Sequence, residues 1–204
     1  MRKVIVTNLV SIDGFIAGPG GNPLVLPMDE SFDRSNLERL QAADTVLLGA
    51  TSYTGFLGYW PSVADAPEPP ADHPMARAFD DTNRAISRRW NEIDKVVVSD
   101  SITSEQTAPW TDTTTIVRRA DAHAHVAKLK EQQGGEIVMF ASHVLWNDLL
   151  RAGLVDELHL MVGPVFVGEG VRSFEGSFDG ALRTVEVRKL DGSDNVLVRY
   201  EVQR

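Results

Sequence analysis

The sequence contains no cysteine among its 204 residues. This absence excludes disulfides, thiol nucleophiles and thiolate metal sites. It also excludes a zinc-dependent nucleobase deaminase, because that class holds its metal partly with a Pro-Cys-x-x-Cys pair. Any catalysis by this chain must therefore use other side chains or a bound cofactor.

Basic residues are scarce, since 20 lysines and arginines stand against 29 acidic residues and give a formal charge of −9. This charge opposes binding to nucleic acid and to anionic membranes. We expect neither partner, although a local basic pocket for a phosphate is compatible with the overall charge.

Long apolar runs are also missing, because none approaches the roughly eighteen residues that a membrane helix requires. The N-terminal stretch MRKVIVTNLVSIDG enters a strand pattern without the apolar core and cleavage site of a signal peptide. We expect a water-soluble cytoplasmic protein. The length suits a single domain spanning residues 1–204.

Eight strand-like runs are present. They are RKVIVTNLV, DTVLLG, DKVVVSD, TTTIVRR, GEIVMFA, VDELHLMVG, LRTVEVRKL and NVLVRYEVQ. The last two are joined by DGSDN, which is typical of a hairpin turn. The final pair should therefore be antiparallel.

Helical patterns separate the earlier strands, at residues 31–43, from Asp72 to Trp90, after Asp121, and after Ser142. Asp72, Asp121 and Ser142 are expected N-caps, and Gly153 is the expected stop of the last helix. Alternating strands and helices predict a largely parallel sheet covered on both faces. The predicted fold is α/β, a three-layer α/β/α sandwich with a mixed sheet of about eight strands.

None of the five histidines is assigned to catalysis or to metal binding. His123 and His125 are two residues apart, so they face different directions on a helix and lack a His-Glu-x-x-His spacing. His143 opens a helix and His159 lies in a strand, where a structural role is the more frequent one. No metal site is expected.

The stretch SIDGFIAGPGGNPLVLPMD at residues 11–29 joins a glycine-rich loop to a carboxylate. A dinucleotide fingerprint needs Gly-x-Gly-x-x-Gly directly before a helix, and this loop runs into PLVLP instead. A surface loop is the better interpretation. Asp13-Gly14 can be a simple turn, and Asp29 can be only an N-cap; neither role excludes a place in a cleft.

Four strings resemble the dihydrofolate-reductase-like superfamily, in the branch that contains the reductase domain of riboflavin biosynthesis. They are SIDGFIAG, DTVLLGATSYTGFLGYWP, DKVVVSDSI and GGEIVMFASHVLWNDLLRAGLVDELHLMVGPVFVGEGVRSF. The resemblance implies a three-layer domain, commonly a homodimer, that binds NADPH or NADH along the C-terminal ends of the central strands. It also implies hydride transfer to a pterin-like, pyrimidine-like or carbonyl substrate.

The resemblance also assigns residues to the site. Asp13 and Gly14 match an element beside the nicotinamide, where the loop of residues 18–25 would act as a lid. The remaining cofactor positions match turns at strand ends and comprise Gly49, Thr51, Ser99, Ser142, Gly168 and Gly170, the last two preceding Phe174. Leu-Pro-Met-Asp at residues 26–29 resembles the Leu-Pro-x-Asp of dihydrofolate reductases, which makes Asp29 a candidate to anchor or protonate the substrate. Glu30 and Asp33 are weaker candidates.

Three positions depart from the family pattern. Ala50 and Asp100 stand where relatives carry arginine, and Ala141 stands where a glycine is expected. The first two changes remove cations from the 2′-phosphate site, and an acid beside a ribose favours NADH. The Cβ of Ala141 narrows the approach to the pyrophosphate. Lys95 and Arg118 or Arg119 lie near strand ends and are further cations to place.

We interpret the sequence as a nicotinamide-dinucleotide-dependent reductase with Asp13 and Asp29 at its catalytic end. The alternative is a binding module that kept the fold and the dimer without catalysis. A flavin or deazaflavin in the same cleft, and genuine folate reduction, stay open as further alternatives.

Overall fold

The computed structural model describes residues 1–70 and 76–203. Its strands are β1 (Val4–Ser11), β2 (Phe15–Ala17), β3 (Ala43–Gly49), β4 (Asp94–Val98), β5 (Thr114–Val117), β6 (Glu136–Phe140), β7 (Glu157–Gly163), β8 (Val171–Arg172), β9 (Ala181–Lys189) and β10 (Val196–Gln203). Its α-helices are α1 (Glu30–Ala42), α2 (Ala50–Leu57), α3 (Trp60–Val63), α4 (Asp81–Glu92), α5 (Ala122–Glu131) and α6 (His143–Arg151).

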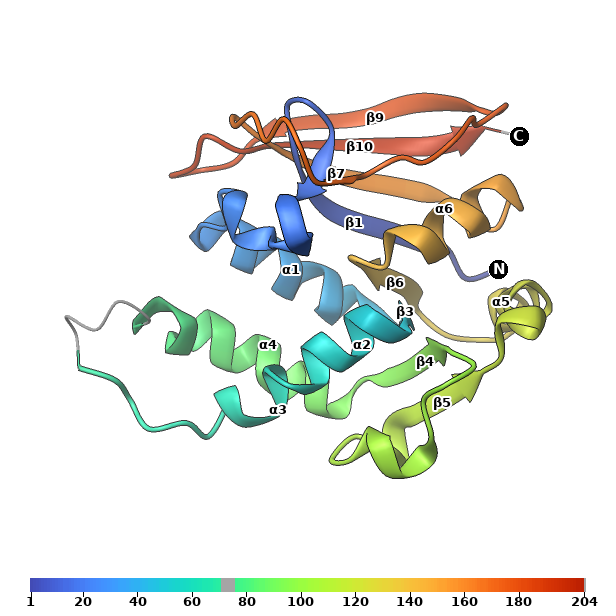
Figure 1. The fold of residues 1–204 in the computed structure, drawn as a ribbon, viewed down its shortest axis with the longest axis horizontal. Helices are drawn as coiled ribbons and strands as arrows, with labels where there is room; N and C mark the ends of the chain where they lie inside the picture. The colour runs from blue at the N-terminus through green and yellow to red at the C-terminus, as the bar shows by residue number, and fades with distance from the viewer. Residues whose placement is uncertain (71–75, 204) are drawn as a thin grey trace.

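Eight strands form one sheet in the order β5-β4-β3-β6-β1-β7-β10-β9, which Figure 1 shows from bottom to top. The six strands from β5 to β7 are parallel to their neighbours, whereas β10 is antiparallel to β7 and to β9. The predicted mixed sheet and its final hairpin are therefore confirmed. The parallel strands β1, β3, β4, β5 and β6 bring their C-terminal ends to one edge of the sheet.

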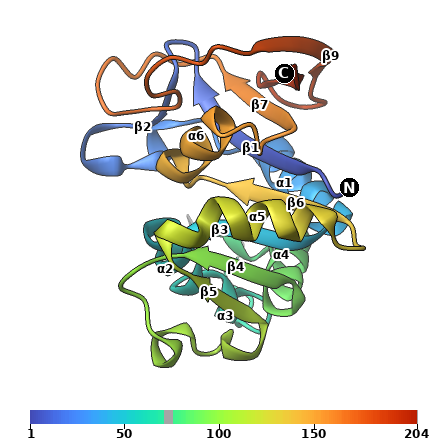
Figure 2. The ribbon, with the colours of Figure 1, turned by 90° about the vertical axis from the view of Figure 1, so that its right-hand side faces the viewer.

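Helices cover both faces of the sheet, as the sandwich prediction required. On one face α5 and α6 pack through Val126, Trp146 and Leu149 against the apolar side chains of β1, β6 and β7. Figure 2 shows these two helices in front of the strands. On the other face α1, α2 and α4 contribute Leu40, Tyr53 and Trp90 to a second core.

Several boundary predictions need correction. The helix that ends near Trp90 begins at Asp81, with Asp80 as its N-cap, and the expected cap Asp72 lies outside the described residues. Asp121 and Ser142 precede their helices, but neither side chain makes a capping hydrogen bond. Gly153 has φ +70° and ends α6 as expected. The short strands β2 and β8 pair with each other and were not predicted, because two or three residues carry no readable periodicity.

Candidate functional site

The starts of α2 and α6 meet at the C-terminal edge of β3 and β6. The N–H of Gly49 donates to Ser142 Oγ at 3.1 Å, and the N–H of Ser142 donates to Ser52 Oγ at 3.0 Å. The structure thus brings Gly49 and Ala50 next to Ser142, which lies some ninety residues further along the sequence. Ser52 was missed because nothing in the sequence relates its hydroxyl to a distant backbone.

Neither α2 nor α6 has a side-chain cap, so the first N–H groups of both helices are left for other acceptors. A helix start combines free donors with the positive end of the helix dipole, which suits a phosphate group. These residues therefore fit the pyrophosphate of a dinucleotide.

Ala141 and Ser142 both adopt left-handed backbone conformations, with φ of 48° and 47°. Residues with a Cβ pay a steric cost there, and such strain collects at functional sites. The position of Ala141 is one that favours glycine, which agrees with the glycine expected from the family pattern. The chain adopts this strained backbone with an alanine where the family pattern has a glycine.

The ends of β4 and β5 form the second part of this edge. Ser99 is buried, and its hydroxyl accepts from the N–H groups of Ser101 and Ile102 at 3.1 and 3.0 Å, so it shapes the turn. The exposed Asp100 carboxylate accepts from the N–H of Arg119 at 3.1 Å and lies 3.8 Å from its guanidinium. Asp100 therefore offsets the charge of Arg119, a cation that the sequence alone did not place.

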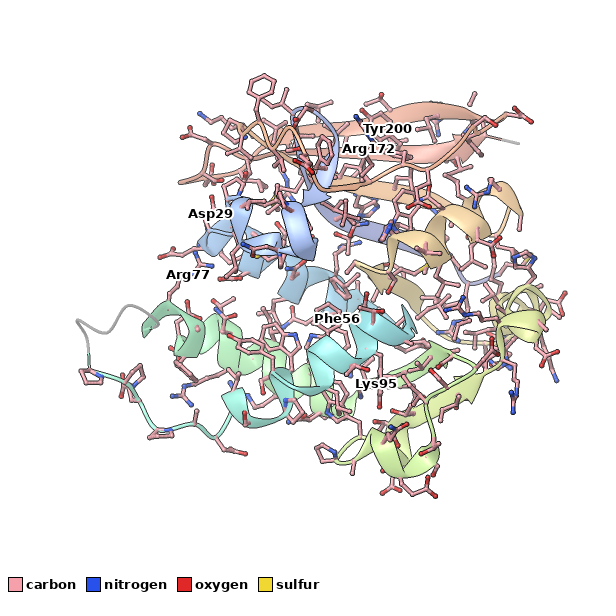
Figure 3. The ribbon with its side chains drawn as sticks, in the orientation of Figure 1. Asp29, Phe56, Arg77, Lys95, Arg172 and Tyr200 are labelled. Carbon is pink, nitrogen blue, oxygen red and sulfur yellow. The ribbon has the colours of Figure 1, made fainter. Side chains whose placement is uncertain are left out.

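Lys95 cannot supply charge to this edge. It is the second residue of β4 and lies at the opposite end of the strand, with 1% of its surface exposed. Figure 3 shows that Lys95 also lies far from Asp29, the residue expected at the substrate end of the site.

Asp13 ties two loops together after the ends of β1 and β7. Its carboxylate accepts from Ser11 Oγ at 2.6 Å, from the N–H of Gly168 at 2.7 Å and from the N–H of Val167 at 3.1 Å. The bond from Ser11, with the two backbone donors, lowers the pKa of Asp13 to about 2. Asp13 thus fixes the glycine-rich turn that contains Gly168 and Gly170. Gly170 itself lies so close to β2 that a Cβ at this position would be 2.2 Å from the carbonyl oxygen of Ala17.

We expect Asp13→Asn to loosen this turn, because an amide cannot replace all three accepted hydrogen bonds. Hydrogen-exchange protection of the Val167 and Gly168 amides should fall about tenfold at neutral pH. Since the folded-state pKa is depressed, the stabilisation by Asp13 is present above pH 4 and is lost as the pH falls towards 2. Equal protection in Asp13→Asn and wild type would contradict this role.

Asp29 is the N-cap of α1 and also binds the β9–β10 turn. One oxygen accepts from the N–H groups of Ser31 and Phe32, both at 3.0 Å, and from the Ser31 hydroxyl. The other accepts from Ser193 Oγ and from Asn195 Nδ2. Burial alone would raise the pKa of Asp29, but these hydrogen bonds outweigh it and lower the pKa. The carboxylate is therefore ionised at neutral pH, so we do not assign it the role of proton donor.

The other predicted residues take separate positions. Thr51 is exposed in the first turn of α2, and Gly14 has φ +85° in the turn after β1. Asp33 of α1 pairs with Arg77, which lies in a 3-10 turn before α4. Phe174 packs edge-on against Trp146 of α6, with ring centroids 5.2 Å apart. The loop of residues 19–25 is exposed and forms two short 3-10 turns.

Three of the histidines have a carboxylate neighbour. His123 lies 2.6 Å from Asp148, His143 lies 3.0 Å from Glu175, and His159 lies 2.8 Å from Glu157. Within residues 1–70 and 76–203, no three His, Asp or Glu side chains are grouped as a metal site requires. No helix in the same ranges has both the length and the apolar character needed to cross a bilayer.

The family model for the RibD C-terminal domain matches residues 2–197. A curated relative, the uncharacterized protein YyaP of Bacillus subtilis (strain 168), is 28% identical over 172 residues, which cover 83% of this chain and 78% of the relative.

Three solved structures share the fold. RibD of Acinetobacter baumannii (form 2) has a TM-score of 0.66 at 16% identity, over 100% of this chain and 58% of that chain. The diaminohydroxyphosphoribosylaminopyrimidine deaminase/5-amino-6-(5-phosphoribosylamino)uracil reductase of Thermotoga maritima has a TM-score of 0.64 at 14% identity, over 98% and 56%. A pyrimidine reductase-like protein of Corynebacterium diphtheriae has a TM-score of 0.59 at 16% identity, over 100% and 92%.

The sheet order and the structural neighbours define a dihydrofolate-reductase-like α/β fold. The chain belongs to the RibD C-terminal domain family. The resemblance inferred from the four sequence strings is thereby confirmed.

Proposed function

We propose that this protein is a reductase that transfers hydride from a nicotinamide dinucleotide to a small pterin-like, pyrimidine-like or carbonyl substrate, acting as one domain over residues 1–204. The observation that carries the proposal is the pair of uncapped helix starts, α2 and α6, joined by the Gly49–Ser142 hydrogen bond at the sheet edge. Membership of a reductase-like family supports it.

The bound dinucleotide would supply the hydride, and the chain would supply binding and orientation. The backbone N–H groups at the starts of α2 and α6 would hold the pyrophosphate. The turn that Asp13 fixes would shape the nicotinamide end. Asp29 would hold the start of α1 beside the substrate, and the loop of residues 18–25 would exclude bulk water. Because both carboxylates are ionised at neutral pH, we assign the proton to solvent.

We use the term cofactor seat for the proposed dinucleotide site formed by the starts of α2 and α6 and the end of β4. We propose that this site does not select for the 2′-phosphate of NADPH. Ala50 offers no cation at the start of α2, and Asp100 pairs with Arg119 at the end of β4. A phosphate there would meet a carboxylate, whereas a ribose hydroxyl could donate to it. The seat therefore suits NADH at least as well as NADPH.

An absorbance assay tests the activity. It measures the oxidation of NADH and of NADPH by the protein in the presence of candidate substrates, a panel of neutral pyrimidines, pterins and small carbonyl compounds. Ala50→Glu should abolish dinucleotide binding, because a carboxylate in the first turn of α2 repels phosphate while remaining favourable for the helix. Gly55→Glu is the matched control, since Gly55 lies on the same helix with open space around its Cα. Turnover that survives Ala50→Glu would contradict the location of the seat.

The second candidate is a binding module of the same fold without catalysis. The altered positions Ala50, Asp100 and Ala141 favour it, since each removes a feature of the family's cofactor seat. A dinucleotide that binds at the α2 and α6 starts without any turnover across the panel would support this candidate over the reductase.

We also propose that the protein is a homodimer that covers β9. This strand is the edge of the sheet, and its Leu182, Val185 and Val187 are 39%, 43% and 66% exposed. An exposed apolar edge strand is prone to pair with another chain. A second copy would bury these side chains.

Val187→Lys should shift the dimer to monomer in light scattering, because a lysine ammonium is costly to bury in an apolar contact. The control is Leu24→Lys, which changes a residue that is 79% exposed and lies outside β9. A wild-type protein that is monomeric at all concentrations would overturn the dimer.

A further inference from the structure

A cavity of about 170 Å³ lies between α1 and the face of β1, β7, β9 and β10. Phe32, Ser35, Asn36 and Arg39 line it from α1, at the spacing of one helix face. None of the residues at the starts of α2 and α6 lines the cavity, so the cavity is separate from the proposed cofactor seat. A cavity of 150 Å³ accommodates benzene, so one six-membered ring with small substituents fits here and a nucleoside does not.

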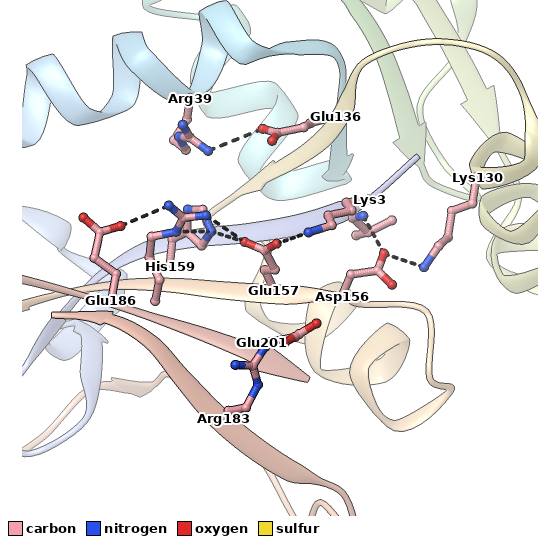
Figure 4. A network of polar contacts seen from close by, with 12 residues as sticks. Lys3, Arg39, Lys130, Glu136, Asp156, Glu157, His159, Arg183, Glu186 and Glu201 are labelled. Atoms are coloured by element: carbon pink, nitrogen blue, oxygen red, sulfur yellow. Dashed lines mark hydrogen bonds and ion pairs between the residues drawn. The ribbon is translucent and has the colours of Figure 1, made fainter. Parts of the chain in front are cut away.

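The charged groups of the lining are already paired with one another. Arg39 contacts Glu38 and Glu136, Arg188 contacts Glu38 and Glu186, and Arg199 contacts Glu186 and Glu157. Figure 4 shows Arg39 facing Glu136, and Glu186, His159 and Glu157 in a row beneath them. An anion would have to compete with these carboxylates, and a cation with these arginines. The lining therefore favours an uncharged ligand.

Five uncharged polar groups of the lining have no side-chain partner within the described part of the chain. They are the Thr7 and Ser35 hydroxyls, Nδ2 of Asn8, the Asn36 carboxamide and Nδ1 of His159. His159 is 2% exposed, and its Nε2 is held by Glu157 at 2.8 Å and by Arg199 at 3.1 Å. Burial, as the largest cause, lowers the pKa of His159 to about 4, so the ring is neutral at pH 7. Its Nδ1 is the ring atom left for a ligand.

The apolar part of the lining is formed by Leu9, Met161, Leu197 and Phe32, which offer a surface for the faces of a flat ring. A carboxamide pairs with a ligand that carries a donor and an acceptor side by side, as a lactam does. Glu38 and Arg188 are the exposed members and mark the mouth.

We infer that this cavity is a second ligand site, which binds a small uncharged planar lactam against Asn36, Ser35 and His159. The site is distinct from the proposed dinucleotide site, because none of its residues lies at the starts of α2 and α6. A bound ligand would stabilise α1, the helix that Asp29 caps.

Titration of the full chain with 2-pyridone, by calorimetry and by ¹H–¹⁵N spectra, tests the site. We expect saturable 1:1 binding in the low millimolar range or tighter, with shifts at Asn36 and His159 and none at Ala50. Asn36→Ala should weaken binding about fivefold, and Ser35→Leu, which fills the cavity, should abolish it. Gln41→Ala removes an exposed amide from the same helix and should leave binding unchanged.

Benzoate, an anion of similar size, should bind at least about tenfold more weakly than 2-pyridone. The inference is overturned by the absence of saturable 2-pyridone binding to the folded wild type, by equal binding of benzoate, or by binding that survives Ser35→Leu. Spectral shifts confined to Ala50 and Ser142 would place the lactam in the cofactor seat and would likewise overturn the inference. The effect of Ala50→Glu on NADH turnover tests the proposed reductase function only. It does not affect the interpretation of the 2-pyridone and benzoate titrations.

Discussion

An Ala50→Arg, Asp100→Ser double variant is expected to bind NADPH about 50-fold more tightly than the wild type does. The new arginine would face the 2′-phosphate from the first turn of α2, and the serine would release Arg119 from its present carboxylate partner. Bidentate contacts between guanidinium and phosphate are among the strongest polar contacts in proteins. Calorimetric titration with NADPH and NADH gives both affinities.

NADH affinity should stay within about threefold of the wild type, because NADH lacks the group that the arginine contacts. Gly55→Arg adds the same charge further along α2 and controls for the general electrostatic effect. The gain should shrink at high salt, since the contact is exposed. An equal gain for NADH, or an equal gain in Gly55→Arg, would contradict the assignment of this edge to the adenosine ribose.

Lys95→Met is expected to make the protein more stable at pH 7 by about 2 kcal/mol. Lys95 is buried, and its Nζ lies 4.6 Å from the centre of the Trp110 ring. The Nζ donates to the Ile93 carbonyl at 2.6 Å and to Thr113 Oγ1 at 3.0 Å. Burial lowers the pKa of Lys95 to about 7. Keeping this amine charged costs the folded state on the order of 4 kcal/mol at pH 7. Losing its two hydrogen bonds returns about 2 kcal/mol of that gain.

The pH dependence separates this effect from simple repacking. A lysine with a lowered folded-state pKa makes the protein less stable as the pH falls from 10.5 towards 7, because the unfolded chain binds the proton first. Urea unfolding of Lys95→Met should lack this contribution, and Lys128→Met, at an exposed lysine, should retain it. Equal slopes in the wild type and Lys95→Met would contradict the burial effect.

Most of the fold was predictable, because each long strand carries its own apolar run. All eight runs became strands of the main sheet, and the DGSDN turn joined the antiparallel pair as expected. The N-cap role of Asp29 was also readable, since capping acts over two or three residues. The strands β2 and β8 depend on each other across the chain, so no local pattern announces them.

The candidate site was less predictable, because its contacts join distant segments. Asp13 binds amides 154 and 155 residues away, and Ser142 binds Gly49 instead of capping its own helix. The sequence placed Asp100 as an acid near a ribose but could not show that Arg119 accompanies it. The sequence left Lys95 as a cation near a strand end that it could not place, whereas the register of β4 puts it in the core at the other end.

The central claim is that the edge formed by α2, α6 and the end of β4 binds a nicotinamide dinucleotide without selecting for the 2′-phosphate. Parallel titrations of the wild-type protein with NADH and NADPH, by calorimetry or by intrinsic fluorescence, test it most directly. The account predicts that NADH binds at least as tightly as NADPH and that Ala50→Glu removes both. Much tighter binding of NADPH, or no binding of either at millimolar concentration, would contradict it.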